Sequence, residues 1–332
     1  MTLDWWIEVL VKMVVVFLVV LTAVAYMTLI ERRVIAAIQA RIGPNRVGPQ
    51  GLFQPAADAL KLMTKETVIP AAADRTLFLL APVLSLVPPI VAFAVIPFGD
   101  SITLFGRTVP LHITDVNVAI LFILSLSSIG VYGVFLGGWA SNNKYALLGS
   151  LRASAQMISY ELTLGLCVVA VVLIAGSFSL VEIVGNQRTI PYVVYQPVGF
   201  LLFLVAAMAE LNRVPFDLPE AEPELVAGYH TEYSGMRFAM YFLGEYAALL
   251  GMTAVITLLF LGGWHVWWPS PAWLAPLWFV AKIMALILFM MWTRGTLPRF
   301  RFDQLMRFGW KVLLPAALAN VFVTALVIAL LG

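Results

Sequence analysis

Carboxylates are concentrated in one segment of this 332-residue chain, residues 211–236. Its acidic residues are Asp217, Glu220, Glu222, Glu224 and Glu232, and the basic residues beside them are Arg213 and Arg237. Glu220 and Glu224 are spaced one helical turn apart. Like charges crowded in this way titrate in a coupled manner. The segment is therefore predicted to take up and release protons, and a solvated acidic loop without that activity is the plainer alternative.

Ionisable residues also occur inside long apolar stretches, namely Glu161, Glu210, Glu245 and Lys282. A charge within a bilayer costs at least ~2.5 kcal/mol on insertion scales, so such residues generally face a polar cavity or a partner. Carboxylates at this depth are predicted to take up protons and to mark an ion path. A structural ion pair, for instance between Lys282 and one of the glutamates, is the alternative.

A third polar stretch runs from Glu31 to Glu66. Glycines and prolines between Gly43 and Gly51 favour defined turns, which would hold Arg41 and Arg46 on rigid backbone. Residues 52–66 sort onto two helical faces, with Leu52, Phe53, Ala56, Ala59, Leu60 and Met63 on one and Gln54, Asp58, Lys61 and Lys65 on the other. This pattern predicts an amphipathic helix in the membrane interface. A generic surface anchor is the alternative, but it gives no reason for an aspartate among the lysines.

Composition indicates which elements must position these residues. With 62% hydrophobic and 11% charged residues, the chain has too little polar surface for a soluble globule of this length. Apolar runs of about 20 residues, the length that crosses a bilayer, lie at residues 9–30, 77–97, 116–139, 156–175, 196–211, 237–261, 272–293 and 312–331. The sequence therefore predicts one all-α integral membrane domain over residues 1–332, with about eight transmembrane helices. Gly133 and Gly137, four residues apart, predict a close helix contact.

The distribution of lysine and arginine predicts the orientation of these helices. The first, third, fifth and seventh connections hold nearly all of them, whereas the second and fourth hold Arg107 and Arg188 and the sixth holds none. Because cytoplasmic loops carry the excess of basic residues, the odd connections are predicted to be cytoplasmic and both termini periplasmic. Residues 31–76, 211–236 and 294–311 would then be the first, the acidic and the basic cytoplasmic loops.

Several classes of function are disfavoured. A net charge of +2 gives no indication of nucleic-acid binding. A single cysteine, Cys167, cannot form an internal disulfide, and three isolated histidines suggest no metal site. We therefore expect no cofactor bound by this chain alone, and we interpret His230 as a polar surface or pocket residue.

Motifs in three connections resemble the signatures of the H-subunit family of respiratory NADH:quinone oxidoreductase, complex I. They are Glu31-Arg32-Arg33, Arg41-Ile42-Gly43-Pro44-Asn45-Arg46-Val47-Gly48, Gln54-Pro55-Ala56-Ala57-Asp58-Ala59-Leu60-Lys61, Pro215-Phe216-Asp217, Glu220-Ala221-Glu222-Pro223-Glu224-Leu225-Val226, Glu232-Tyr233-Ser234, and Leu297-Pro298-Arg299 with Arg301-Phe302-Asp303-Gln304-Leu305-Met306. The similarity extends over essentially the whole chain.

This resemblance implies an eight-helix subunit of a proton-pumping translocase that forms the quinone entry chamber and carries no redox centre. By motif, the chamber residues would be Glu31, Arg32, Arg41, Arg46, Phe53 and Asp58, the coupling loop Asp217, Glu220, Glu222, Glu224 and Glu232, and the proton path Glu161, Glu210 and Glu245, with Lys282 added by its depth. The implied partners are peripheral-arm quinone-site subunits, antiporter-like membrane subunits, lipid, and quinone as substrate. FMN and iron–sulfur clusters would be held by partner subunits.

The resemblance also suggests a mechanism and a location. Quinone reduction places negative charge and a demand for protons in a dry chamber, where uncompensated charge is unfavourable. Reprotonation of the acidic loop through the buried glutamates would bias the conformational states that drive pumping. Two alternatives remain open: a related subunit of a membrane-bound hydrogenase-type complex, and a stand-alone ion transporter, although no inverted repeat supports the latter. We expect a multi-pass protein of the bacterial inner membrane.

Overall fold

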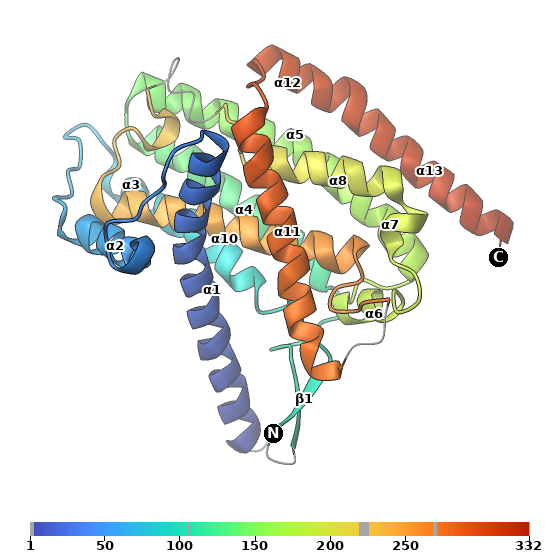
Figure 1. Cartoon of the computed structure of the whole chain (residues 1–332). Coiled ribbons are helices and arrows are strands. Elements are labelled where there is room, and N and C mark those ends of the chain that lie inside the picture. The colour runs from blue at the N-terminus through green and yellow to red at the C-terminus, as the bar shows by residue number, and fades with distance from the viewer. Residues whose placement is uncertain (1–2, 105–106, 219–225, 268–270, 332) are drawn as a thin grey trace.

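The computed structural model describes the chain except for residues 1–2, 105–106, 219–225, 268–270 and 332, and it is mostly helical (Figure 1). The helices are α1 Leu3–Ile38, α2 Gln54–Thr64, α3 Arg75–Ala92, α4 Ala119–Ala140, α5 Lys144–Ala175, α6 Leu180–Gly185, α7 Tyr192–Tyr195, α8 Pro197–Glu210, α10 Gly235–Phe260, α11 Ala275–Thr296, α12 Phe302–Phe308 and α13 Leu314–Leu331. A π-helical segment, Gly309–Leu313, joins the last two. Strands β1 Ser101–Leu104 and β2 Arg107–Pro110 form an antiparallel hairpin, with Ser101 opposite Pro110.

Seven helical segments of the described chain are long and apolar enough to cross a membrane. They are α1, α3, α4, α5, α10, α11 and the continuous segment Phe302–Leu330. This confirms a mostly helical, multi-pass membrane protein, with the β1–β2 hairpin as an exception to the all-α prediction. The expected number of about eight is not confirmed, because the run at 196–211 gives only the 14-residue helix α8. At 1.5 Å per residue α8 measures about 21 Å, less than the roughly 30 Å of bilayer hydrocarbon.

Helix ends differ from the sequence prediction where charged residues continue a helix. The first connection was predicted to begin at Glu31, but α1 continues to Ile38, so Glu31, Arg32 and Arg33 are helical. Likewise α5 begins at Lys144, well before the predicted residue 156. Arg, Lys and Glu are good helix formers, so a helix does not have to stop where its apolar run stops. Helix α2 lies within the predicted interval 52–66, and its Pro55 falls in the first turn, where proline is tolerated.

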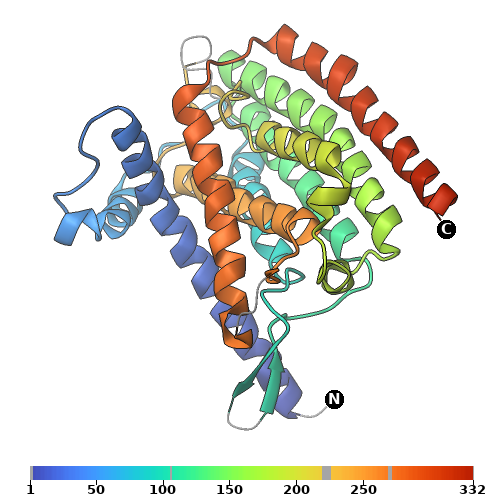
Figure 2. The same cartoon turned by 45° about the vertical axis from the view of Figure 1, so that its right-hand side comes forward.

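Helix α10 occupies the centre of the molecule. It packs against α3, α1 and α11, while α5 packs against α4, α8 and α13 (Figures 1 and 2). Of the seven long helices α10 is the most enclosed, with 67% of its most apolar window buried. The side chains that α10 carries are therefore largely enclosed by the neighbouring helices.

Small residues allow the closest helix contacts. A Cβ atom on Gly133 of α4 would lie 2.6 Å from the backbone nitrogen of Ser85 on α3, and one on Gly137 would lie 2.2 Å from Tyr241 Oη on α10. Both positions therefore require glycine, which confirms the predicted packing role. On α10, a Cβ on Gly244 would lie 2.8 Å from the Ser85 carbonyl oxygen.

Two prolines weaken α3 where α10 approaches it. Pro88 and Pro89 have no N–H, so the carbonyls of Leu84 and Ser85 lose their helical donors. Gly244 brings the α10 backbone next to the Ser85 carbonyl. The two prolines also line a partly open cavity between α3, α4 and α10.

Candidate functional site

Four charged side chains from four segments meet inside the bundle. Glu31 of α1 accepts a hydrogen bond from Arg213, with 2.8 Å between Glu31 Oε2 and Arg213 Nη1, and it also pairs with Arg294 of α11. Arg213 Nη2 lies 3.0 Å from Oε1 of Glu245 on α10. The side chains of Arg213 and Glu31 are only 2% and 3% exposed. We call Glu31, Arg213, Glu245 and Arg294 the charge cluster.

Arg213 is the centre of the charge cluster. Burial opposes its charge, but Glu245 and Glu31 outweigh this effect and raise the pKa of Arg213. The ring of Tyr246 lies 4.8 Å from Arg213 Cζ and contributes a cation–π contact. A buried cation is stable only when it is paired and hydrogen-bonded. Arg213 therefore holds α1 and α10 together through their carboxylates.

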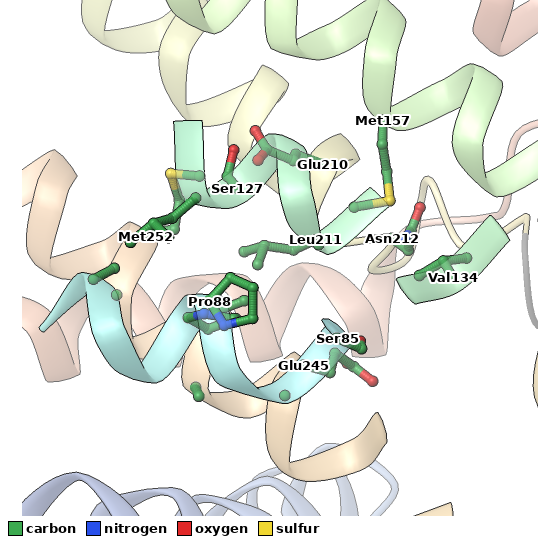
Figure 3. A pocket seen from close by; sticks show the side chains of 18 of the residues that line it. Ser85, Pro88, Ser127, Val134, Met157, Glu210, Leu211, Asn212, Glu245 and Met252 are labelled. Atoms are coloured by element: carbon green, nitrogen blue, oxygen red, sulfur yellow. The ribbon is translucent and has the colours of Figure 1, made fainter. Parts of the chain in front are cut away.

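A partly open cavity of about 120 Å³ begins beside Glu245 (Figure 3). Apolar residues form most of its wall, and its carboxylates are those of Glu245 and of Glu210 of α8. Glu210 is 7% exposed and lies next to Ser127 of α4. Within the described chain, Glu210 Oε2 and Asn212 Oδ1 are buried without a hydrogen-bond partner. The volume is sufficient for several water molecules, and these two oxygens are acceptors for them.

Glu161 of α5 lies beside α4. Ser128 of α4 donates a hydrogen bond to Glu161 Oε1, which ties the carboxylate of α5 to α4. Glu161 is partly exposed and is not among the residues that line the cavity, although Met157 one turn earlier is. The structure thus brings Glu210 and Glu245 to one cavity and leaves Glu161 beside it.

The N-terminal polar stretch forms a second layer next to the charge cluster. Arg32 Nη1 lies 2.7 Å from Asp58 Oδ2 of α2, and Gln54 Nε2 donates to the other carboxylate oxygen at 3.2 Å. Glu31 and Arg32 are consecutive, so one points into the bundle and the other towards α2. Asp58 is thus a specific partner for α1, a role that a generic anchor helix does not explain.

The turn between α1 and α2 depends on glycine. Gly48 and Gly51 have φ values of 73° and 76°, and a Cβ on Gly51 would lie 2.3 Å from the Pro44 carbonyl oxygen. Arg33 donates to the Gln50 carbonyl from the end of α1.

The other predicted chamber residues of this region lie on the surface. Arg41 is exposed and donates to Gln39 Oε1 at 2.7 Å, and Arg46 is exposed. Phe53 is 55% exposed.

Three connections touch one another at the same end of the molecule. Val68 N donates to Ser234 Oγ at 3.4 Å, and Phe300 N donates to the Pro215 carbonyl at 3.1 Å. Arg299 donates to the carbonyl of Asp217. Glu232 accepts a hydrogen bond from Asn143 Nδ2 at 2.6 Å. The remaining acidic residues predicted here, Glu220, Glu222 and Glu224, lie outside the described residues.

His230 was expected on the surface or in a polar pocket, and the structure buries it among aromatic rings. Its ring centroid lies 4.8 Å from that of Tyr229, 5.5 Å from that of Phe238 and 6.2 Å from that of Phe242. Burial lowers the pKa of His230 to about 4. The imidazole is therefore neutral at physiological pH and packs as an aromatic residue.

Within the described chain Lys282 forms no ion pair with a glutamate, so the suggested pairing of Lys282 is wrong, whereas Glu245 does form a structural ion pair, with Arg213. Its Nζ donates to the carbonyl oxygens of Leu261 at 2.6 Å, Gly263 at 2.9 Å and His265 at 2.6 Å. The part of the chain that the structure describes contains no group of three or more His, Cys, Asp or Glu residues able to hold a metal ion.

Sequence reasoning missed the two arginines of the charge cluster and the ring of Tyr246. Arg213 gave one signal, because it is the sole arginine or lysine of the acidic segment 211–236 and follows Glu210 by three positions. Arg294 gave none, since it was one of several arginines in a basic connection.

Comparison with known proteins gives a consistent result. The family model described as NADH dehydrogenase matches residues 11–325. The H subunit numbered 1 of NADH-quinone oxidoreductase from Geobacter metallireducens is 57% identical over 97% of this chain and 96% of its own length. The H subunit numbered 2 from Geobacter sulfurreducens is 55% identical over 96% and 95%, and the H subunit from Thermomicrobium roseum is 53% identical over 93% and 92%.

Proposed function

Because this chain belongs to the NADH dehydrogenase family, we propose that it forms the quinone entry chamber of a proton-pumping NADH:quinone oxidoreductase and couples quinone reduction to proton translocation. The relatives named above are H subunits of NADH-quinone oxidoreductase. The proposal assigns quinone binding to the α1–α2 region and proton coupling to the charge cluster and the cavity beside it.

The observation that carries this proposal is a pair of charged networks that start from adjacent residues of α1. Asp58 pairs with Arg32, the neighbouring Glu31 pairs with Arg213, and Arg213 reaches Glu245 at the cavity. Glu210 lies on the same cavity. A charge that develops beside α2 is thus connected through fixed partners to carboxylates inside the bundle. Electrostatic effects are transmitted strongly there, because little water screens them.

In the proposed mechanism, a quinone binds beside Arg32, Arg41, Arg46, Phe53 and Asp58. Its reduction demands protons, which the acidic coupling loop supplies, and this loop is then left charged. Waters in the cavity carry protons between Glu245 and Glu210, and the path continues to Glu161 beside α4. Lys282 lies apart from these carboxylates, bonded to backbone carbonyls, and has no part in the proposed path.

The finer topology belongs to the same proposal. Helix α8, extended by the preceding helix α7, would complete an eighth crossing and return the C-terminus to the periplasmic side of a bacterial inner membrane. Residues 39–53, 211–234 and 297–301 would then face the cytoplasm. There they would meet the peripheral-arm subunits that hold FMN and the iron–sulfur clusters, while antiporter-like subunits would pack beside the bundle.

Glu210→Gln tests the coupling role, because glutamine keeps the size of the side chain and cannot carry a proton. In the assembled enzyme we expect a loss of proton pumping of at least about 10²-fold, the lower end of the usual contribution of a positioned proton-transfer group. Pumping is measured by quenching of a pH-sensitive dye in sealed vesicles, and NADH:quinone reductase activity is measured in parallel. Glu8→Gln is the matched control, since Glu8 lies near the start of α1 and pairs with Lys12. Equal pumping by both variants would overturn the proposal.

Purification distinguishes this function from that of a stand-alone transporter. A subunit of the proposed enzyme co-purifies with a large assembly whose quinone reductase activity responds to quinone-site inhibitors. Ion transport by the reconstituted chain alone would favour the transporter instead.

A further inference from the structure

The ammonium group of Lys282 is enclosed by the segment that follows α10. Three carbonyl oxygens, from Leu261, Gly263 and His265, lie 2.6 to 2.9 Å from Nζ. The ring centroid of Trp267 lies 5.0 Å from the same nitrogen. An ammonium has three N–H donors and no acceptor, so these carbonyls accept all of its hydrogen bonds. The aromatic ring adds a cation–π contact.

The end of α10 is built to present these carbonyls. Gly262 and Gly263 have φ values of 69° and 53°, the left-handed conformation that favours glycine. Gly263 N donates to the Thr257 carbonyl at 2.9 Å, a bond between residues six apart that reverses the chain at a helix end. Gln187 Oε1 accepts from Gly262 N at 3.0 Å and holds the turn from outside.

Hydrogen bonds within the loop also shape this backbone. His265 N donates to the Gly262 carbonyl at 2.9 Å, and Leu261 N donates to the Thr257 carbonyl at 3.1 Å. The carbonyls at positions 261, 263 and 265 alternate with these internal bonds and converge on one point. The loop thus favours this convergence, and Lys282 of α11 fills it and stabilises it.

We propose that residues 261–267 form a binding site for a primary ammonium cation, and that this chain fills the site with its own Lys282 to lock α11 against the end of α10. The three carbonyls would otherwise face one another without donors in a partly buried site, which is unfavourable. Charge-assisted hydrogen bonds to the ammonium remove this penalty. Helices α10 and α11 carry Glu245 and Arg294, so the same lock sets the spacing of the charge cluster.

This role differs from that of a proton carrier. All three N–H groups of Lys282 are donated to fixed carbonyls, so release of a proton would leave one carbonyl without a donor. A proton carrier also needs a second group to receive the proton, and the hydrogen-bond partners of Lys282 are backbone oxygens. The site is thus structural and should accept a free cation of the same chemistry when the side chain is shortened.

Lys282→Ala with n-propylammonium tests the proposal, because that ion replaces the three carbons and the nitrogen beyond Cβ that the substitution removes. The readout is hydrogen exchange of the backbone amides of residues 261–267 in the purified assembly, together with its thermal midpoint. We expect exchange at least about tenfold faster in the variant. Added n-propylammonium should restore slow exchange and the midpoint. Tetramethylammonium, which has no N–H donor, should restore neither.

The wild-type chain and Lys311→Ala are the controls. Lys311 is exposed in the π-helical segment, so its loss should leave the loop protected and n-propylammonium without effect. Equal responses of Lys282→Ala and the controls to both salts would overturn the proposal, as would unchanged exchange in Lys282→Ala.

If Lys282→Ala fails to accumulate, Lys282→Arg decides. A guanidinium cannot direct three N–H bonds from one atom, so faster exchange of residues 261–267 is expected and wild-type protection would refute the site. Neither readout depends on quinone reductase activity, so this test and that of the proposed function fail independently.

Discussion

Arg213→Met is the sharpest test of the charge cluster. Methionine approximates the length of the stem but removes the cation, so Glu31 keeps only Arg294 and Glu245 loses its ion-pair partner within the described chain. Both Arg213 and Glu31 are almost completely buried. Removing one partner of a buried pair costs about 3–5 kcal/mol, because the other charge remains without compensation. That cost corresponds to a factor of roughly 10² to 5 × 10³ in the folding equilibrium.

The chain offers an exposed pair for comparison. Arg301 and Asp303 are bonded at 2.5 Å, but their side chains are 72% and 47% exposed. Arg301→Met should therefore have little effect on stability, because solvent screens this exposed pair. The two variants lose the same functional group, so the difference between them measures burial.

Denaturant unfolding of the purified assembly, followed by loss of helical signal, measures both costs. A second substitution, Glu245→Gln, in the Arg213→Met background removes the orphaned carboxylate and should recover part of the lost stability, which a double-mutant cycle quantifies. Equal midpoints for Arg213→Met and Arg301→Met would refute the reasoning, and so would the absence of recovery in the double variant.

Two further predictions concern packing around the cavity. Burial lowers the pKa of His230 from 6.5 to about 4. The contribution of His230 to folding stability is therefore fully present above pH 6.5 and is lost as pH falls towards 4, because the unfolded chain then binds a proton that the folded chain does not. The thermal midpoint of the wild type should fall more between pH 7 and pH 5 than that of His230→Phe, and parallel curves would contradict this. Gly137→Ala should destabilise the chain by about 1–3 kcal/mol, since its Cβ would lie 2.2 Å from Tyr241 Oη. Gly130→Ala should be close to neutral, because a Cβ there would meet nothing within 4 Å. Equal unfolding midpoints for the two variants would show that the contact with Tyr241 relaxes freely.

Much of the fold could be predicted from local properties of the sequence. An apolar run of sufficient length specifies a membrane helix by itself, because each backbone group is satisfied within that helix. The amphipathic pattern located α2, and the spacing of Gly133 and Gly137 identified a close contact. Predictions failed at helix ends, where propensity continues a helix past its apolar run, and at the short helix α8, whose length falls below the crossing distance.

The candidate site was only partly predictable for a related reason. Depth in an apolar run is readable from sequence, so Glu210, Glu245 and Lys282 could be identified as unusual residues. Their partners could not, because pairing depends on which way each helix faces. Both Glu245 and Lys282 lie deep in apolar runs, yet Glu245 forms an ion pair with Arg213 and Lys282 donates hydrogen bonds to three backbone carbonyls.

The sequence by itself therefore determined the class of the protein, its membrane helices, its family and the residues that stand out as polar in an apolar chain. Only the tertiary structure decided which of these residues meet. Glu31 joins Arg213 across 182 positions and Arg294 across 263. The physical reason is that a charge inside a membrane protein is stable only beside a fixed partner, and the rotation and packing of whole helices choose that partner.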